Sequence, residues 1–339
     1  MNNELCISAE ASRNDVLTKI QEIVTIGISF VALIGTFYTF GTREKRNQTF
    51  HFNFKLILWN VWLSVFLHVF FAFFANLYNI LLQAFSAYCD NFYTKWVCVL
   101  LRWPISWTTV SLTFLHLAAF TERYMATRSR GNYEKMGKRI GICLIAATWL
   151  ITVVISYAAY GTSNYNEYIP VCTVTLDDNR DRIKILLYVL MAVDGVTTVA
   201  DVVLYVMNKR EIARGYGTKF KDYSLSKSFQ QTENYVTSRL IIPVSLIYSA
   251  FYLSYLIIAI SARGLFGDPS QKSYFVTAIA IAHYLLDTSM VLCISVYIRI
   301  SYKMQRDRNR LDLVQSDSRK TEAYFRQLGA LWNNMPPVG

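Results

Sequence analysis

Residues 56–80 read LILWNVWLSVFLHVFFAFFANLYNI, and this stretch decides the fold class. It contains no Asp, Glu, Lys or Arg. A helix rises 1.5 Å per residue, so about twenty apolar residues cover the roughly 30 Å hydrocarbon core of a bilayer. The stretch does not alternate between apolar and polar residues as the strand of a membrane barrel would. It therefore predicts a transmembrane helix.

Six further apolar blocks of similar length occur along the chain. Together the predicted spans are residues 20–40, 56–80, 96–120, 140–160, 185–207, 240–262 and 274–298. The third contains Arg102, and the fifth contains Asp194 and Asp201, so these two are the least apolar, and a count of six spans is the alternative. The pattern predicts an all-α membrane protein with a bundle of seven transmembrane helices.

The cations are distributed unevenly between the connecting segments. Of the 34 Lys and Arg residues, 25 lie in segments that seven spans would place on one side of the membrane. These segments are residues 41–55, 121–139, 208–239 and 299–339. Because cytoplasmic loops carry the excess of Lys and Arg, we expect the N-terminus outside the cell and the C-terminus in the cytoplasm.

The net charge of +11 follows from this topology. Basic residues at the cytoplasmic ends of spans face anionic lipid, so membrane lipid is the expected partner and nucleic acid is not. The predicted organisation is an extracellular N-terminal stub over residues 1–18, a seven-helix domain over residues 19–300 and a cytoplasmic tail over residues 301–339.

Cysteines and one sequon test the topology. Cys6, Cys89, Cys98 and Cys172 all fall on the predicted outer side or at its edge. Disulfides among them suit the oxidising compartment that those loops pass through, although four cysteines allow three pairings. The one Asn-x-Ser/Thr sequon, at residues 47–49, lies on the predicted inner side and should stay unmodified.

Enzyme signatures are poor, and neither His-Glu-x-x-His nor Cys-x-x-Cys occurs. His283 and Asp287 share a face of the last span, which is at most half a metal site, so we expect them to hydrogen-bond to each other. Asp194 and Asp201 share a face of the fifth span about 10 Å apart. The Tyr-Asp and Gly-x-Gly-Asp motifs typical of intramembrane aspartyl proteases are missing. We predict no enzyme, no metal and no cofactor.

The charged segment TERYMATRSRGNYEKMGKR, residues 121–139, separates the third and fourth spans. Its triplet Glu122, Arg123 and Tyr124 lies where the third span meets the cytoplasm. Cys98 precedes Arg123 by 25 residues, which is about 38 Å along a helix. One helix therefore carries a thiol at its outer end and a charged triplet at its inner end.

This arrangement resembles the third helix of the seven-helix G-protein-coupled receptors. In that family an Asp/Glu-Arg-Tyr triplet ends the helix, and a Cys one span earlier is bridged to the loop after helix four. The resemblance implies a disulfide between Cys98 and Cys172.

The resemblance also implies an activation switch. The carboxylate of Glu122 would hold the guanidinium of Arg123 at rest, and Arg123 would change partners when neighbouring spans part. Tyr124 completes the triplet, and Tyr297 is the residue that remains of the usual Asn-Pro-x-x-Tyr motif in span seven. An interfacial ion pair contributes only about 1 kcal/mol, which suits a two-state element. The alternative is that Arg123 extends to the lipid headgroups.

A narrower resemblance lies in the inner loops. ERYMATRSRGNYEK at residues 122–135 is similar to the Glu-Arg-x-x-Ala-Thr…Tyr-Glu signature of the nematode serpentine chemoreceptors of classes Sra, Srab, Srb and Sre. LSKSFQQTEN at residues 225–234 is similar to their Leu-Ser-x-Arg-Tyr-Gln-x-x-Glu-Asn motif, with Ser228 and Phe229 in place of Arg and Tyr. FHFNFK at residues 50–55 looks like their first inner loop. The chain is identified as a member of this superfamily, with class epsilon (Sre) as the best match.

Membership implies a chemosensory receptor in the plasma membrane, with a sensory cilium as the expected location. Such a receptor binds a small-molecule cue from outside and signals to a heterotrimeric G protein. The positions that match the inner-loop motifs, and so are expected to face the G protein, are Tyr133, Glu134, Glu233 and Asn234.

The ligand pocket of such a bundle would open outward among spans three, five, six and seven. Arg102, one turn below the outer Cys of span three, is expected to line it with Trp103, Trp107 and Asp194. A charge within a span is costly unless it is paired, so Arg102 either meets an acidic ligand group or forms an ion pair with Asp194.

Two other functions are alternatives. An odorant-gated channel of inverted topology would place the N-terminus inside, and a multi-span transporter would tend to show internal repeats and broken helices.

Overall fold

The structure is a computed structural model that describes residues 16–42, 51–86, 93–128, 137–161, 168–169, 172, 179–215, 225–266 and 272–333. The chain forms two compact units, Met1–Val296 and Tyr297–Gly339. Helices make up most of the described residues. The predicted sequon at residues 47–49 and the predicted outer cysteines Cys6 and Cys89 lie outside the described residues.

Seven long helices occur in the described part of the chain. They are α2 (Val16–Gly41), α4 (Phe52–Phe85), α5 (Lys95–Arg128), α6 (Arg139–Tyr160), α7 (Arg180–Gly215), α8 (Leu225–Leu265) and α9 (Lys272–Asn333). Each contains a segment long and apolar enough to cross a membrane. The seven-helix bundle predicted from hydropathy is therefore confirmed, and the six-span alternative is wrong.

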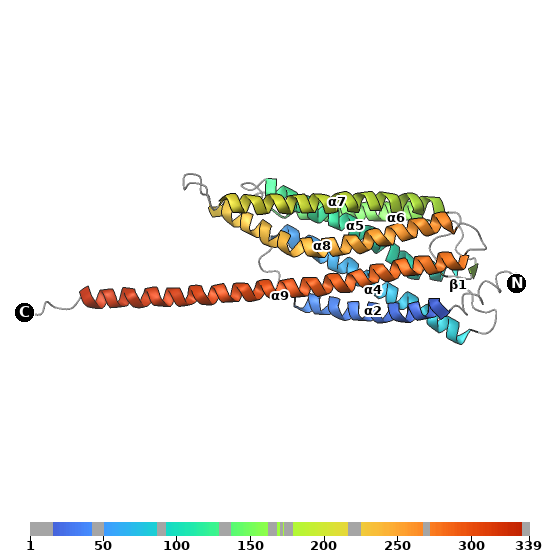
Figure 1. The fold of residues 1–339 in the computed structure, drawn as a ribbon, viewed down its shortest axis with the longest axis horizontal. Coiled ribbons are helices and arrows are strands. Elements are labelled where there is room, and N and C mark those ends of the chain that lie inside the picture. The colour runs from blue at the N-terminus through green and yellow to red at the C-terminus, as the bar shows by residue number, and fades with distance from the viewer. Residues whose placement is uncertain are drawn as a thin grey trace, which may run out of the picture. The chain divides into compact units, whose positions relative to one another are not determined.

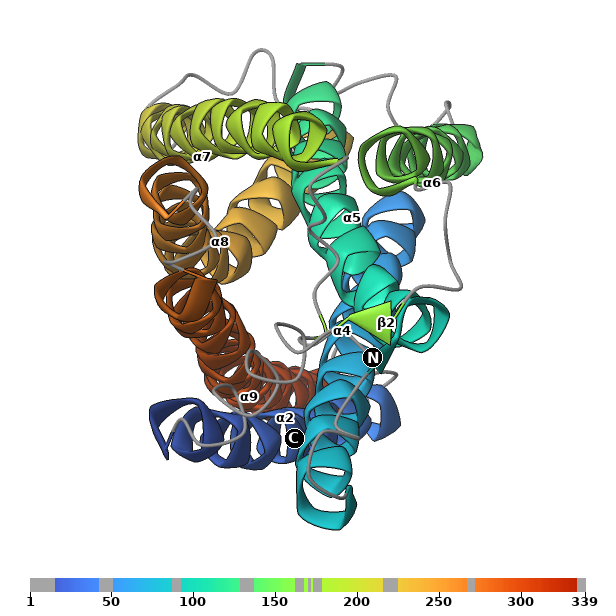
Figure 2. The same cartoon turned by 90° about the vertical axis from the view of Figure 1, so that its right-hand side faces the viewer.

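Within the first unit, α5 is the central helix and packs against α4, α6, α7 and α8. In the end-on view, α2, α4, α5, α7, α8 and the first part of α9 form a ring, and α6 lies on the outside against α4 and α5 (Figures 1 and 2). Side chains on the inner faces of six helices therefore converge, with α5 placed to contact most of them.

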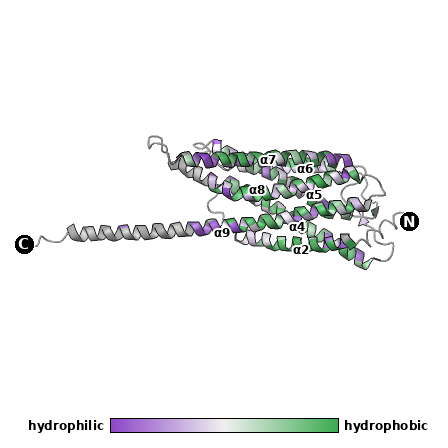
Figure 3. Ribbon diagram, viewed as in Figure 1, coloured by the Kyte–Doolittle hydropathy of each residue, from purple (hydrophilic) through white to green (hydrophobic). Residues whose placement is uncertain are grey.

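The bundle differs from a soluble protein, whose core is mostly apolar, because many of its buried side chains are polar and many of its exposed ones are apolar. On α6, Val153 is exposed while the neighbouring Thr152 is buried, and on α7 Val196 is exposed while Asp194 is buried. Hydrophobic residues run along the helices of the first unit, and hydrophilic residues gather at the two ends of α7 (Figure 3). Such a surface suits contact with lipid, and it leaves the polar side chains to bond to one another inside.

Two short strands and a disulfide close one end of the bundle. β1 (Tyr93–Thr94) pairs antiparallel with β2 (Tyr168–Ile169), a ladder that the hydropathy pattern did not predict. Cys98, in the first turn of α5, forms a disulfide with Cys172, and both sulfurs pack beside the buried Tyr93 ring. The segment between α6 and α7 is thereby tied to the start of α5.

The helices run beyond the predicted spans. α5 continues to Arg128, so the Glu-Arg-Tyr triplet lies within a helix and not in a loop. The second unit, Tyr297–Gly339, is helical as far as Asn333 and contains Tyr297, the predicted switch residue.

Candidate functional site

A cavity lies among the helices at the disulfide end of the first unit. Counted with the part that is open to solvent, its space is about 1240 Å³. All seven helices, the strand β1 and Cys172 contribute to its lining. Its charged or ionisable side chains other than tyrosine are Glu22, Arg102, Arg263, His283 and Asp287.

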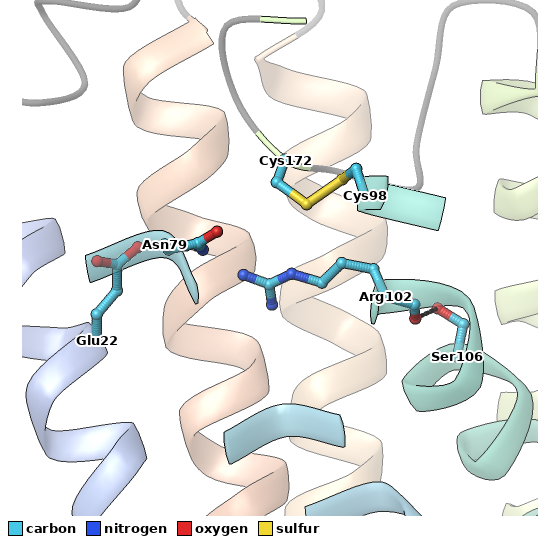
Figure 4. Close-up of a disulfide and its surroundings, with 6 residues drawn as sticks. All are labelled: Glu22, Asn79, Cys98, Arg102, Ser106 and Cys172. Atoms are coloured by element: carbon cyan, nitrogen blue, oxygen red, sulfur yellow. Dashed lines mark hydrogen bonds between the residues drawn. A yellow bond between two sulfur atoms is a disulfide. The ribbon is translucent and has the colours of Figure 1, made fainter. Parts of the chain in front are cut away.

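Two opposite charges face each other across this cavity. Glu22 projects from α2, and its Oε1 accepts a hydrogen bond from Asn79 Nδ2 at 3.3 Å. Arg102 projects from α5, one turn after Cys98, and its guanidinium points toward Glu22 and Asn79 just below the disulfide (Figure 4). No ion pair joins Arg102 to Glu22 or to any other described carboxylate.

Several polar atoms on the lining residues have no hydrogen-bond partner among the described residues. They are Gln21 Oε1, Glu22 Oε2, Asn79 Oδ1 and Arg102 Nε. A buried polar group without a partner costs about 1–3 kcal/mol. The cavity is therefore lined by groups whose hydrogen bonds are incomplete in the protein alone.

A polar bridge joins three helices beside the cavity. The ring of His68 on α4 contacts Thr108 Oγ1 on α5 through Nδ1 at 3.1 Å, and Asp287 Oδ1 on α9 through Nε2 at 3.2 Å. Asp287 also lines the cavity. The predicted bond between His283 and Asp287 is wrong, because Asp287 faces α4, whereas the His283 ring packs against Tyr255 at 5.4 Å.

A second bridge holds α5 to α7. His116 Nδ1 lies 3.0 Å from Asp194 Oδ1, and His116 Nε2 lies 2.9 Å from Asp201 Oδ2. The two aspartates do share a helix face, as their spacing of seven predicts, and that face holds the histidine. The alternative of an Arg102–Asp194 ion pair is wrong, because the carboxylate of Asp194 contacts His116. An imidazole can donate to both carboxylates only when it is protonated.

The charged triplet lies toward the other end of α5. Arg123 is only 4% exposed, so its side chain lies inside the bundle and does not extend to the headgroups. Arg123 Nη2 donates to Glu122 Oε1 at 2.7 Å, and Nε donates to Glu122 Oε2. Nη1 donates to Asn234 Oδ1 on α8 at 3.4 Å, and the guanidinium lies 4.5 Å from the centroid of the Phe54 ring on α4. The guanidinium therefore connects α5 with α4 and α8.

The remaining predicted residues lie elsewhere. Trp107 packs against Trp149 at 5.0 Å, Trp103 is 39% exposed, and neither of them nor Asp194 lines the cavity, so Arg102 is the predicted pocket residue that does. Tyr124 is exposed and stacks on Phe120. Tyr133, Glu134 and the side chain of Glu233 lie outside the described residues.

Three residues of the site were missed by reasoning from the sequence. Glu22, His68 and His116 all lie within predicted spans, where a charged or ionisable side chain is costly and therefore informative. That signal was available for each of them. Their partners could not be read from spacing, because these lie between 40 and 219 residues away along the chain.

Comparison with known proteins gives one family. A family model described as serpentine type 7TM GPCR receptor class ab chemoreceptor matches residues 6–333. Among Caenorhabditis elegans proteins, serpentine receptor class alpha/beta-14 is 22% identical over 240 residues, 70% of this chain and 61% of the relative. Serpentine receptor class alpha-39 is 25% identical over 190 residues, 55% of this chain and 48% of the relative.

A third relative belongs to another class. Serpentine receptor class epsilon-37 of Caenorhabditis elegans is 25% identical over 256 residues, 68% of this chain and 66% of the relative. The aligned part of the chain therefore spans about half to two thirds of these relatives. The matching family model is that of class ab, whereas the inner-loop motifs gave class epsilon as the best match within the superfamily.

Proposed function

This chain belongs to the serpentine class ab chemoreceptor family, and we propose that it binds a small-molecule cue in the cavity and signals to a heterotrimeric G protein. The family is a chemoreceptor class and not an enzyme family, and the chain is a multi-pass membrane protein. One observation carries the proposal. A single helix, α5, presents Arg102 to a cavity and Arg123 to a buried polar cluster 21 residues later, about 32 Å along its axis.

The disulfide end of the bundle faces the outside of the cell in this proposal. Of the 34 Lys and Arg residues, 25 belong to the segments that a count of seven spans assigns to the side opposite the disulfide, as expected for cytoplasmic loops. The Cys98–Cys172 disulfide suits the oxidising side of the membrane. An epitope tag at the N-terminus should then be stained on intact cells, and a tag at the C-terminus only after permeabilisation. The reverse result would favour the inverted channel.

The ligand site is the cavity below the disulfide. Arg102 lines the cavity and has no ion-pair partner among the described residues, so it is the residue proposed to meet an acidic group of the ligand. Asp287, on another wall, is joined through His68 to Thr108 on α5. A ligand that contacts both walls can therefore change how α4, α5 and α9 bond to one another.

The signalling end is the cluster of Arg123, Glu122 and Asn234. The Arg123–Asn234 bond crosses from α5 to α8 and is long, at 3.4 Å, so a small outward movement of α8 breaks it. The Glu122 bonds lie within α5, so they do not oppose movement of α8, but they hold the guanidinium until Arg123 leaves the carboxylate. Arg123 would then exchange Glu122 for the G protein in the space that α8 leaves. Two such states need differ by only a few kcal/mol.

Nucleotide exchange on a panel of heterotrimeric G proteins tests this function. The full chain is reconstituted in nanodiscs, and its basal stimulation of GTPγS binding is measured. Arg123→Ala should abolish the stimulation, while Glu122→Gln should raise it several-fold because the charge that holds the guanidinium is lost. Arg128→Ala is the matched control, since Arg128 is exposed in the last turn of the same helix. Stimulation that survives Arg123→Ala would refute the proposed switch.

A further inference from the structure

One wall of the cavity is rich in hydrogen-bond acceptors. Gln21 Oε1, Glu22 Oε2 and Asn79 Oδ1 have no partner among the described residues. The orientation of the Asn79 amide is set by its Nδ2, which donates to Glu22 Oε1 and leaves Oδ1 as the acceptor. Small rotations about the terminal torsions, which are broad, turn such oxygens toward the cavity. The wall thus presents one negative charge and three acceptors.

The facing wall is a donor. Arg102 Nε has no hydrogen-bond partner among the described residues, and the guanidinium points across the cavity toward Glu22 and Asn79 (Figure 4). Guanidinium groups bind carboxylates through two parallel N–H···O bonds. Arg102 and Glu22 do not complete this pairing themselves, so each retains an unfulfilled preference for a charge of the opposite sign.

Apolar side chains line much of the cavity between these two walls. They include Ile105, Ile183, Leu187, Phe275, Val276 and Ile279. A ligand that fits must therefore carry an apolar body as well as its charged groups.

From this arrangement we propose that the ligand is a zwitterion with an apolar body, of the chemistry that amino acids and short peptides share. Its ammonium group, with three N–H donors and one positive charge, meets the acceptors around Glu22. Its carboxylate meets Arg102. A ligand with one charge satisfies one wall and leaves the other unpaired, which a low-dielectric site penalises. The inference rests on the proposed function and names the ligand class of the same cavity.

Ligand binding is measured on the purified full chain in nanodiscs by thermal unfolding. Cys293 is buried and free, so once the exposed Cys143 is replaced by Ser, the increase in reaction with a fluorogenic maleimide over that of the folded chain reports unfolding. The probes are leucine and the dipeptide Leu-Leu, each compared with its amide, which lacks the anion, and with its deaminated acid, which lacks the cation. At least one zwitterion should raise the melting temperature, and removal of either charge should weaken its binding at least tenfold. Binding of leucine would indicate an amino acid as the ligand, and binding of Leu-Leu would indicate a short peptide.

Charge-removing variants give a crossed pattern that a merely structural role would not produce. In Arg102→Gln the zwitterion should lose its advantage over its amide and keep its advantage over the deaminated acid. In Glu22→Gln the reverse should hold. Arg128→Gln, an exposed site on the same helix, should retain both preferences.

Three outcomes would overturn the inference. They are failure of both zwitterions to bind, equal binding of singly charged analogues, and preferences that survive Arg102→Gln and Glu22→Gln. Another outcome is that the deaminated acid binds as tightly as the zwitterion in sodium chloride but not in N-methylglucamine chloride. In that case a sodium ion, and not an ammonium group of the ligand, neutralises Glu22, and this result also overturns the proposal of a zwitterionic ligand. Loss of basal nucleotide exchange in Arg123→Ala tests the receptor function separately. If the probes do not bind but Arg123→Ala still abolishes basal nucleotide exchange, the ligand class alone is overturned.

Discussion

Removal of His116 is the perturbation whose effect on stability follows most directly from the structure. Its ring makes two interhelical bonds to carboxylates, at 3.0 Å to Asp194 and 2.9 Å to Asp201. Interhelical hydrogen bonds inside membrane proteins contribute about 0.6 kcal/mol on average and about 1.7 kcal/mol at most. Two of them therefore contribute about 1–3 kcal/mol. His116→Ala also leaves two carboxylates on one helix face without their shared partner, which adds to the loss.

We expect His116→Ala to lower the free energy of unfolding by about 2–4 kcal/mol. This corresponds to a fall of roughly 4–8 °C in melting temperature, at about 2 °C per kcal/mol for a chain of this size. Reaction of the buried Cys293 thiol in the Cys143→Ser background measures it. Thr109→Val is the matched control, because the hydroxyl of this buried α5 residue donates only to Ile105 O in its own helix. It should change the melting temperature by about 1 °C or less.

A double-mutant cycle shows whether the bridge is the cause. If His116 and Asp201 bond to each other, Asp201→Asn should cost much less in the His116→Ala background than in the wild-type chain. The coupling energy should be about 1 kcal/mol, because one interhelical bond is shared. Effects of the two substitutions that add within about 0.3–0.5 kcal/mol would show that the two residues act independently and would refute the bridge.

Three further predictions test the end that carries the disulfide and the packing of α6. Cys98→Ser should destabilise the chain by up to about 4 kcal/mol in the chain-entropy account, since the disulfide spans 74 residues, and added reductant should reproduce the fall in melting temperature. Gly141→Ala should lower the melting temperature by a few degrees, because a Cβ there would lie 2.9 Å from the Asn53 backbone; Gly195→Ala, with nothing within 4 Å, should not. Burial raises the pKa of Tyr93 above its ordinary 10.0 and favours the neutral phenol, so its contribution to stability should be intact below pH 10 and be lost above it; in thermal melts, Tyr93→Phe should lose less stability above pH 10 than the wild-type chain does.

Local chemistry made some features of this protein predictable. The seven spans follow from runs of apolar residues, since insertion of a helix in lipid depends on the composition of about twenty consecutive residues. The sharing of one face by Asp194 and Asp201 follows from the helix period. The superfamily followed from motifs in the inner loops. The short β1–β2 ladder was not foreseen, because two-residue strands carry no period of their own.

The pairing of buried charges was decided by tertiary structure. Arg102 and Asp194 were a reasonable pair from their depth in the membrane, and His283 and Asp287 from their spacing, yet neither pair forms among the described residues. Asp194 bonds to His116 instead, and Asp287 bonds to His68, 219 residues away. Glu22 could be recognised as a site residue only from the structure, in which α2 places it across the cavity from Arg102.

The sequence by itself therefore determined that the chain crosses a membrane seven times, that its cations gather on one side and that its central helix carries a charged triplet. Only the tertiary structure decided which polar groups meet and which face an open cavity. The physical reason is that hydropathy sets the length and depth of a helix but not its rotation about its own axis. In a bundle with polar side chains on its inner faces, that rotation selects the partners.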